Sequence, residues 1–127
     1  MNERDFTISG KIVDPHSRRI YPGKIYVAKG FIEAIEETDD VAEHFILPGL
    51  IDSHIHIESS LLSPQQFAQV AITHGTVATV SDPHEIANVL GEDGIWYMVN
   101  SGRKTPLKFY FGRSEEHTSE LQSPLCI

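Results

Sequence analysis

The sequence is poor in cysteine, in long apolar runs and in positive charge. Its single cysteine, Cys126, excludes a disulfide framework within one chain. No apolar run approaches the roughly 20 residues that a membrane-spanning helix needs, and the polar residues after Met1 fit neither a signal peptide nor a transit peptide. Lysine and arginine number 10 against 18 aspartates and glutamates, so the formal charge of −8 offers no basic patch for nucleic acid. We therefore expect a cytoplasmic protein with no nucleic-acid and no membrane partner.

The composition otherwise fits one small globular domain, but the last fifteen residues do not fit it. The chain has 127 residues, of which 40% are hydrophobic and 22% are charged. After the apolar run 107–112 the hydrophobic periodicity ends. The residues from Arg113 to Ser123, RSEEHTSELQS, resemble a common sequencing adapter translated in frame. We predict a non-native tail over residues 113–127, preceded by the start of a longer protein; a polar tail encoded by the organism is the alternative.

Residues 1–47 have the pattern of a small antiparallel β-sandwich segment. Short runs with strand-like alternation, such as 24–28, are separated by turn residues. We predict turns at Asp14-Pro15, at Tyr21-Pro22-Gly23 and at Lys29-Gly30, the last of these a tight hairpin turn. No catalytic constellation occurs in this segment.

Pro48-Gly49 marks a boundary, after which strands and helices alternate. One predicted helix starts at Pro64, after the N-cap Ser63, and Gln66 completes an S-x-x-Q capping box. Periodicity predicts strands at 50–57, at 76–80 and from 108, and helices at 64–74, 85–90 and 93–101. Such alternation predicts an α/β fold with a parallel sheet over residues 48–112.

Four polar side chains lie two residues apart on the strand predicted at 50–57. They are Asp52, His54, His56 and Glu58. On a strand they share one face, while the isoleucines between them face the other way and should pack under helices. Buried polar groups are costly unless they are paired or bound to metal, and imidazoles at i and i+2 can present nitrogens to one Zn, Fe or Mn ion. We predict His54 and His56 as metal ligands and Glu58 as a further candidate; ordinary surface histidines are the alternative.

A second polar cluster, Ser81-Asp82-Pro83-His84-Glu85, directly follows the strand predicted at 76–80. Active sites of parallel α/β folds and barrels lie at the carboxyl ends of strands, so we expect this cluster at the same end of the sheet as the first. Asp82, His84 and Glu85 are candidates for further ligands, for partners that orient His54 or His56, or for proton carriers. In the structural alternative, Asp82-Pro83 starts a helix and Glu85 favours the N-terminus of that helix.

These residues resemble the amidohydrolase superfamily, whose metal-dependent hydrolases combine an N-terminal β-sandwich segment with a (β/α)8 barrel. The resemblance rests on the small β segment and on L-P-G-L-I-D-S-H-I-H with its H-x-H. Within the superfamily the match to the adenine deaminase family is close. Its signatures resemble H-I-E-S-S within 54–60, L-S-P-Q-Q-F at 62–67 and S-D-P-H-E-I-A-N-V-L-G at 81–91.

The resemblance implies hydrolytic deamination of adenine to hypoxanthine and ammonia, in purine salvage. His54 and His56 match the first-strand ligands of a binuclear centre of divalent metal ions, with Mn or Fe expected and Zn as the alternative. A metal-bound hydroxide would attack C6 of the purine, which is the small-molecule substrate. The catalytic residues stay open, with His84, Glu85 and Asp82 as candidates. Homo-oligomerisation of the full-length protein also stays open.

The resemblance covers residues 6–112, and the remaining metal ligands of the family follow the third barrel strand. A barrel needs about 200 residues or more. We therefore expect residues 48–112 to be the first β/α units of a truncated barrel, and the 127-residue chain to be inactive. The alternatives are another hydrolase of cyclic amides, dihydroorotase-like or imidazolonepropionase-like, and a non-catalytic metal-binding module.

Overall fold

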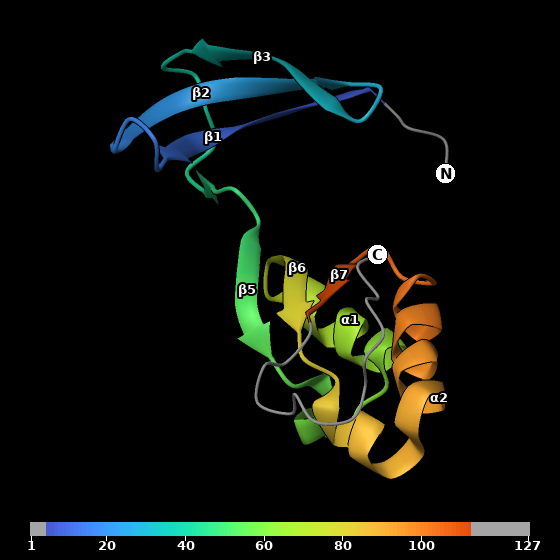
Figure 1. Cartoon of the computed structure of the whole chain (residues 1–127). Helices are drawn as coiled ribbons and strands as arrows, with labels where there is room; N and C mark the ends of the chain where they lie inside the picture. Colours follow the sequence, from blue (N-terminus) through green and yellow to red (C-terminus); the bar gives the residue numbers. More distant parts are fainter. Residues whose placement is uncertain (1–4, 113–127) are drawn as a thin grey trace. The chain divides into compact units, whose positions relative to one another are not determined.

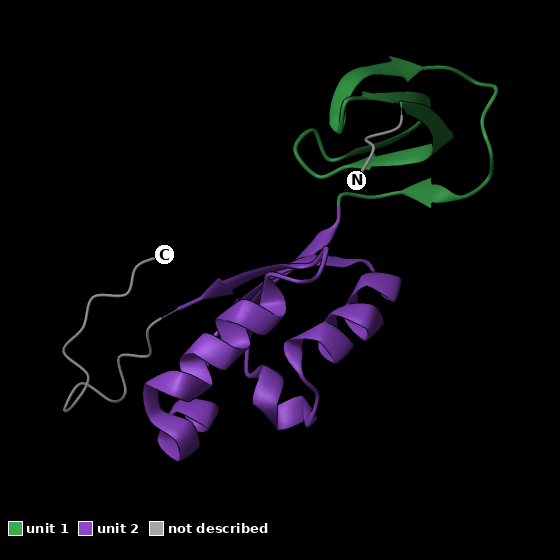
Figure 2. Cartoon of the chain, turned by 90° about the vertical axis from the view of Figure 1, so that its right-hand side faces the viewer, with its two compact units in different colours: residues 1–48 green, residues 49–127 purple. Residues whose placement is uncertain are grey.

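The computed structural model describes residues 5–112, and the chain divides into two compact units, Met1–Pro48 and Gly49–Ile127 (Figure 2). The predicted non-native tail, residues 113–127, lies outside the described residues. Each unit is built around one sheet, and the two sheets differ in strand direction.

The first unit is a four-stranded sheet with the order β3-β2-β1-β4 (Figure 1). Its strands are β1 Phe6–Asp14, β2 Arg19–Ala28, β3 Phe31–Glu37 and β4 Phe45–Ile46. The pairs β1–β2 and β2–β3 are antiparallel, whereas the short β4 runs parallel to β1. The described residues form one sheet, so the second layer of a sandwich stays a prediction.

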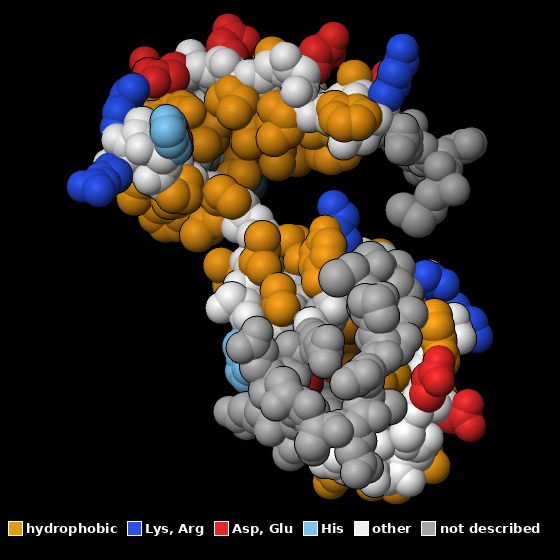
Figure 3. Space-filling view, in the orientation of Figure 1, with side chains coloured by type: hydrophobic (Ala, Val, Ile, Leu, Met, Phe, Trp, Pro, Cys, Tyr) orange, Lys and Arg blue, Asp and Glu red, His pale blue; other side chains and the backbone are white. Residues whose placement is uncertain are grey.

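One face of this sheet is apolar and only partly covered. Ile8 of β1 lies opposite Ile25 of β2, and Ile25 in turn lies opposite Ile35 of β3. Ile12 and Ile25 are buried, at 5% and 7% exposure, but Ile35 is 49% exposed. Hydrophobic side chains accordingly gather on this part of the surface (Figure 3). Such a face is typical of a sheet in a two-layer β structure.

Two of the predicted turns occur, and the third does not. Asp14 accepts hydrogen bonds from the backbone N–H of His16 and Ser17 in the β1–β2 turn, and its hydrogen bonds to Ser17 hold the pKa of the Asp14 carboxyl below its usual range. Lys29 and Gly30 have φ values of 52° and 78°, as a type I′ hairpin requires.

The turn predicted at Tyr21-Pro22-Gly23 is wrong, because all three residues lie inside β2. The Pro22 carbonyl accepts the N–H of Thr38, just beyond the end of the β3 ladder, so the N–H that proline lacks is not needed there. A Cβ on Gly23 would lie 2.7 Å from Cδ1 of Ile12 and 2.8 Å from the Glu36 carbonyl oxygen. The glycine therefore permits close packing between strands and does not mark a turn.

The second unit is a parallel sheet with the order β5-β6-β7, connected by helices that cover one face (Figure 1). Its elements are β5 Leu50–Ile55, the 3-10 helix η1 Ile57–Ser60, α1 Pro64–Thr73, β6 Thr76–Ser81, α2 His84–Gly102 and β7 Lys108–Phe111. This confirms the α/β fold. Closure of the sheet into a barrel stays a prediction. None of the helices that the structure describes is long and apolar enough to cross a membrane.

Helix α1 packs on the sheet through a small apolar cluster. Ala68, Ala71 and Leu107 are buried together, and Phe67 and Phe109 pack against them. The predicted capping box is present: Ser63 Oγ accepts the N–H of Gln66, and the Gln66 side chain accepts the N–H of Ser63.

Helix α2 contains both helices predicted at 85–90 and 93–101, which meet at a kink. Its one non-helical residue, Gly91, has φ 59° and ψ −140° and produces a kink between its two parts. The helix begins at His84, one residue before the predicted start, so both His84 and Glu85 lie in its first turn.

The end of β5 differs from the prediction. The strand ends at Ile55, and the chain then turns into η1, with Ile57 completely buried. Between the pairs Asp52↔Thr79 and Ile55↔Ser81, β5 contains one residue more than β6, which is a bulge-like irregularity beside His54. The simple alternation of faces is lost there. Ile51, which should have packed under the helices, is 66% exposed.

Candidate metal centre

The two polar clusters lie at the same end of the parallel sheet. His54 belongs to β5 and His56 directly follows it, while Asp82 follows β6 and His84 starts α2. The N–H of Asp82 donates to the Ile55 carbonyl at 3.1 Å, which joins the two strand ends directly. Residues 26 or more positions apart in the sequence thus share one small region, and the parallel topology produces this arrangement.

His54 and His56 present the same type of nitrogen to each other. Their Nε2 atoms lie 3.2 Å apart, and the two rings are nearly perpendicular at 80°. Two imidazole nitrogens that bind one tetrahedral ion, each about 2.1 Å from it, lie about 3.4 Å apart. The histidine pair therefore has the spacing that one bound divalent ion requires.

The backbone of Asp82 determines which nitrogen of His56 is available for a metal. Nδ1 of His56 lies 3.1 Å from the Asp82 carbonyl oxygen. A carbonyl can only accept a hydrogen bond, so Nδ1 of a neutral His56 carries the proton and Nε2 carries the lone pair. Metal-binding histidines commonly have their second nitrogen held in this way. His56 is thus oriented as a ligand through Nε2, the atom that faces His54.

The side chain of Asp82 holds a second histidine. Its Oδ2 lies 3.0 Å from Nδ1 of His84, and both side chains are partly buried. The rings of His56 and His84 meet edge to face with their centroids 4.7 Å apart. Asp82 therefore orients His56 with its carbonyl group and His84 with its carboxylate.

The first turn of α2 is also tied to η1. Oε1 of Glu85 accepts the hydroxyl of Ser59 at 2.8 Å, and Oε1 of Glu58 accepts the N–H of Ile86 at 3.3 Å. The second oxygen of Glu58, Oε2, is buried and has no hydrogen-bond partner among the described residues. Glu58 thus lies on a 3-10 helix and not on a strand face shared with His54 and His56, so that part of the prediction is wrong.

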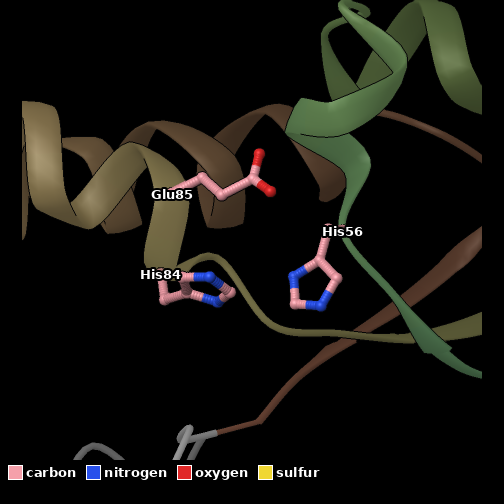
Figure 4. A group of neighbouring side chains, drawn as sticks. All are labelled: His56, His84 and Glu85. Carbon is pink, nitrogen blue, oxygen red and sulfur yellow. The ribbon is translucent and has the colours of Figure 1, made fainter. Parts of the chain in front are cut away.

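Three possible metal-binding side chains lie close together (Figure 4). One donor atom from each of His56, His84 and Glu85 lies within 4.8 Å of the other two. His56 approaches from the end of β5, and the other two side chains extend from the first turn of α2 toward it. Two histidines and one glutamate are a donor set that catalytic zinc sites use. The donor chemistry therefore fits a divalent ion.

Asp52 was expected on the same strand face as His54 and His56, but its side chain bonds to the backbone. Its Oδ1 accepts the N–H of His54 at 3.1 Å, so the carboxylate supports the local backbone at the bulge. Two contributions of the site were absent from the sequence prediction: the hydroxyl of Ser59 on Glu85 and the carbonyl of Asp82 on His56. The serine is visible in the sequence next to Glu58, but a backbone carbonyl gives no sequence signal.

The sequence of the chain is similar to those of known proteins. The model of the Amidohydrolase family matches residues 45–121. An adenine deaminase of Sulfurovum sp. (strain NBC37-1) is 58% identical over 102 residues, which are 80% of this chain and 19% of that protein. Adenine deaminases of Salinibacter ruber and Methanosarcina barkeri are 52% and 56% identical, over 84% of this chain and 20% and 19% of their own lengths. The chain thus spans about a fifth of the length of the curated relatives it matches.

Proposed function

The chain belongs to the amidohydrolase family, and from this premise we propose that it supplies the first metal-binding strand of an enzyme that deaminates adenine to hypoxanthine and ammonia. The substrate comes from the relatives, which are named adenine deaminases and are more than half identical to this chain over most of its length. The observation that carries the proposal is the His54–His56 pair, with its Nε2 atoms 3.2 Å apart.

His54 and His56 are the residues that we propose hold a divalent ion. The expected centre is binuclear with Mn or Fe, and Zn is the alternative, since all three accept imidazole ligands. When bound, such an ion supplies Lewis-acid chemistry and lowers the pKa of water toward neutrality. Glu58 remains a further candidate ligand, because its buried Oε2 has no partner among the described residues.

In this proposal, the neighbouring residues orient the metal ligands or take part in the reaction. The Asp82 carbonyl keeps the proton of His56 on Nδ1, which leaves Nε2 for the ion. The Asp82 carboxylate holds His84 in one orientation. His84 and Glu85 lie close enough to His56 to contribute either ligands or proton carriers for the departure of ammonia.

A segment exchange tests the proposed substrate. Residues 6–112 replace the matching segment of the Sulfurovum adenine deaminase, and the purified chimera is assayed for ammonia release from adenine. We expect deamination that is lost in the same chimera with His54→Ala. Hydrolysis of dihydroorotate or imidazolonepropionate in place of adenine would contradict the substrate and favour one of the two other hydrolase classes.

The isolated 127-residue chain is a separate case. The described residues supply few ligands for a binuclear centre, so we propose that the chain alone binds metal without turning over adenine. The measurement is adenine turnover by the purified chain with Mn²⁺ or Fe²⁺, and steady ammonia release would refute it. A cooperative melt that metal stabilises, without deamination by the chimera, would favour a non-catalytic metal-binding module.

A further inference from the structure

We propose that Glu58 and Ser59 are positioning residues, which cap helix α2 from η1 and thereby hold the side chains of its first turn toward His56. This inference rests on the proposed function, because the first turn of α2 carries His84 and Glu85. It applies equally whether these two side chains bind an ion or carry protons.

Helix α2 begins without a capping side chain of its own. Its N-cap residue is Pro83, which has no side-chain oxygen to accept the N–H groups of the first turn. In α1, by contrast, the hydroxyl of the N-cap Ser63 accepts the N–H of Gln66. The kink at Gly91 separates residues 84–90 from the rest of α2, and so short a helix is marginal unless other contacts support it. The first turn of α2 therefore needs an acceptor from another element.

Glu58 supplies this acceptor from η1. Its Oε1 accepts the N–H of Ile86 at 3.3 Å, across 28 positions of the sequence. Ile86 is the third residue of α2, one of the two positions whose N–H an N-cap side chain normally accepts. The negative charge of Glu58 also lies at the end of the helix where the dipole favours an anion. Because this contact uses Oε1 alone, it does not depend on whether Oε2 binds an ion.

Ser59 makes the second contact, with the side chain of Glu85. Its hydroxyl donates to Oε1 of Glu85 at 2.8 Å. No other hydrogen bond holds this carboxylate within residues 5–112. A carboxylate with one oxygen held presents its second oxygen in a defined direction, and donor atoms of Glu85 and His56 lie within 4.8 Å of each other. Loss of the hydroxyl would leave the Glu85 side chain free to rotate.

The turn that carries Glu58 and Ser59 is itself held by hydrogen bonds. The hydroxyl of Ser60 donates to the Ile57 carbonyl at 2.6 Å, and the N–H of Leu61 donates to the Glu58 carbonyl at 2.9 Å. Leu61 has φ 59°, the left-handed conformation with which η1 ends. The two capping side chains therefore extend from a fixed turn to two adjacent residues of α2.

The cap joins the two segments that carry the candidate site. His56 directly precedes η1, and His84 and Glu85 are the first two residues of α2. The ring centroids of His56 and His84 lie 4.7 Å apart. Contacts between η1 and the start of α2 thus determine how the side chains of His84 and Glu85 lie relative to His56.

Ser59→Ala in the Sulfurovum chimera tests the role in the reaction. With excess Mn²⁺, we expect kcat for adenine to fall about 10-fold, while KM and Tm stay close to those of the unmodified chimera, because one side chain is freed without a change in the fold. Ser59→Thr keeps a hydroxyl and should restore kcat. Ser17→Ala is the matched control, since Ser17 donates in the same way to the Asp14 carboxylate in the β1–β2 turn.

Amide hydrogen exchange in the metal-free 127-residue chain, followed by NMR, tests the cap itself. The N–H of Ile86 should exchange about 5-fold faster in Glu58→Ala, which removes its acceptor. Glu58→Gln keeps a side-chain oxygen that can accept the same hydrogen bond, so exchange should stay slow. Glu92→Gln, further along α2, controls for the change of charge and should leave the exchange of Ile86 unchanged.

The outcomes separate this inference from the proposed function. A chimera that deaminates adenine with an unchanged kcat in Ser59→Ala would overturn the role of Ser59 and leave the proposed function intact. A loss in Ser59→Ala that Ser59→Thr does not restore would also overturn it. Equal exchange of the Ile86 N–H in the wild type and in Glu58→Ala would overturn the cap. A chimera without deamination would contradict the proposed function, and the exchange experiment would still decide the cap.

Discussion

The two units of this chain use β-structure in different ways. In Met1–Pro48, neighbouring strands are joined by short turns and pair with antiparallel ladders, so the contacts are mostly local. In Gly49–Ile127, parallel strands are separated by helices, and the polar residues gather where β5 and β6 end. The candidate metal centre lies in the second unit, where the parallel strands β5 and β6 place their carboxyl ends at the same edge of the sheet.

Among variants that should affect only one of the two units, we expect the largest effect, a loss of metal binding, from His56→Ala. His56 is the member common to both donor groups, so its removal should weaken Mn²⁺ or Co²⁺ binding by more than the about 10- to 100-fold typical of losing a residue that only orients a ligand. Calorimetric titration measures the change. His16→Ala, in the β1–β2 turn, is the control, and equal losses in the two variants would show that the first unit also takes part in binding.

A smaller loss is expected from Asp82→Asn. Asparagine retains the backbone carbonyl that holds His56 but replaces the carboxylate that holds His84. We expect a decrease in metal affinity of about 10- to 100-fold. Asp93→Asn, further along α2, controls for the change of charge. An unchanged affinity in Asp82→Asn would mean that the carboxylate does not support the centre.

Gly23→Val should disturb the first unit alone. The new Cβ would meet Cδ1 of Ile12 at 2.7 Å and the Glu36 carbonyl oxygen at 2.8 Å, so the central strand must shift. Overpacking of this kind typically costs about 1–3 kcal/mol of the free energy of unfolding. Chemical denaturation measures the loss, and Thr7→Val on the neighbouring strand is the control. A simultaneous loss of metal binding would show that the two units depend on each other.

The smallest effect is expected from Ser63→Ala, which removes the N-cap of α1. The serine hydroxyl no longer accepts the N–H of Gln66 or donates to the Gln66 side chain, at a cost of about 1 kcal/mol in the free energy of unfolding. Because α1 contributes no donor to the metal centre, the affinity for Co²⁺ should remain unchanged. Gln65→Ala, exposed in the same turn, is the control, and equal stabilities of the two variants would contradict a role of the cap.

Much of this arrangement could be predicted from local sequence patterns. The capping box at Ser63 and the hairpin at Lys29-Gly30 depend on residues close in sequence, and both occur where they were predicted. Tyr21-Pro22-Gly23 was misassigned as a turn because Gly23 is required by the neighbouring strands, which the local sequence does not reveal.

Part of the candidate site could likewise be predicted from the sequence, and part could not. The spacing of His54 and His56 and the polarity of the D-P-H-E segment are visible in the sequence. The bulge beside His54 and the end of β5 at Ile55 depend on pairing with β6, so simple alternation wrongly placed Glu58 on the strand. The Asp82 carbonyl on His56 could not be predicted, since every residue has a carbonyl and only the tertiary structure determines which one is nearby.

The geometry of the centre also depends on Ile57, a side chain that has no polar atoms. It lies between His56 and Glu58 and is completely buried, so its burial holds the turn from which these two groups project on either side. A smaller residue at this position would leave all the donor groups in the sequence but relax the distances between them. The precision of the centre is therefore set partly by hydrophobic packing, and replacing the donor residues alone would not reveal that contribution.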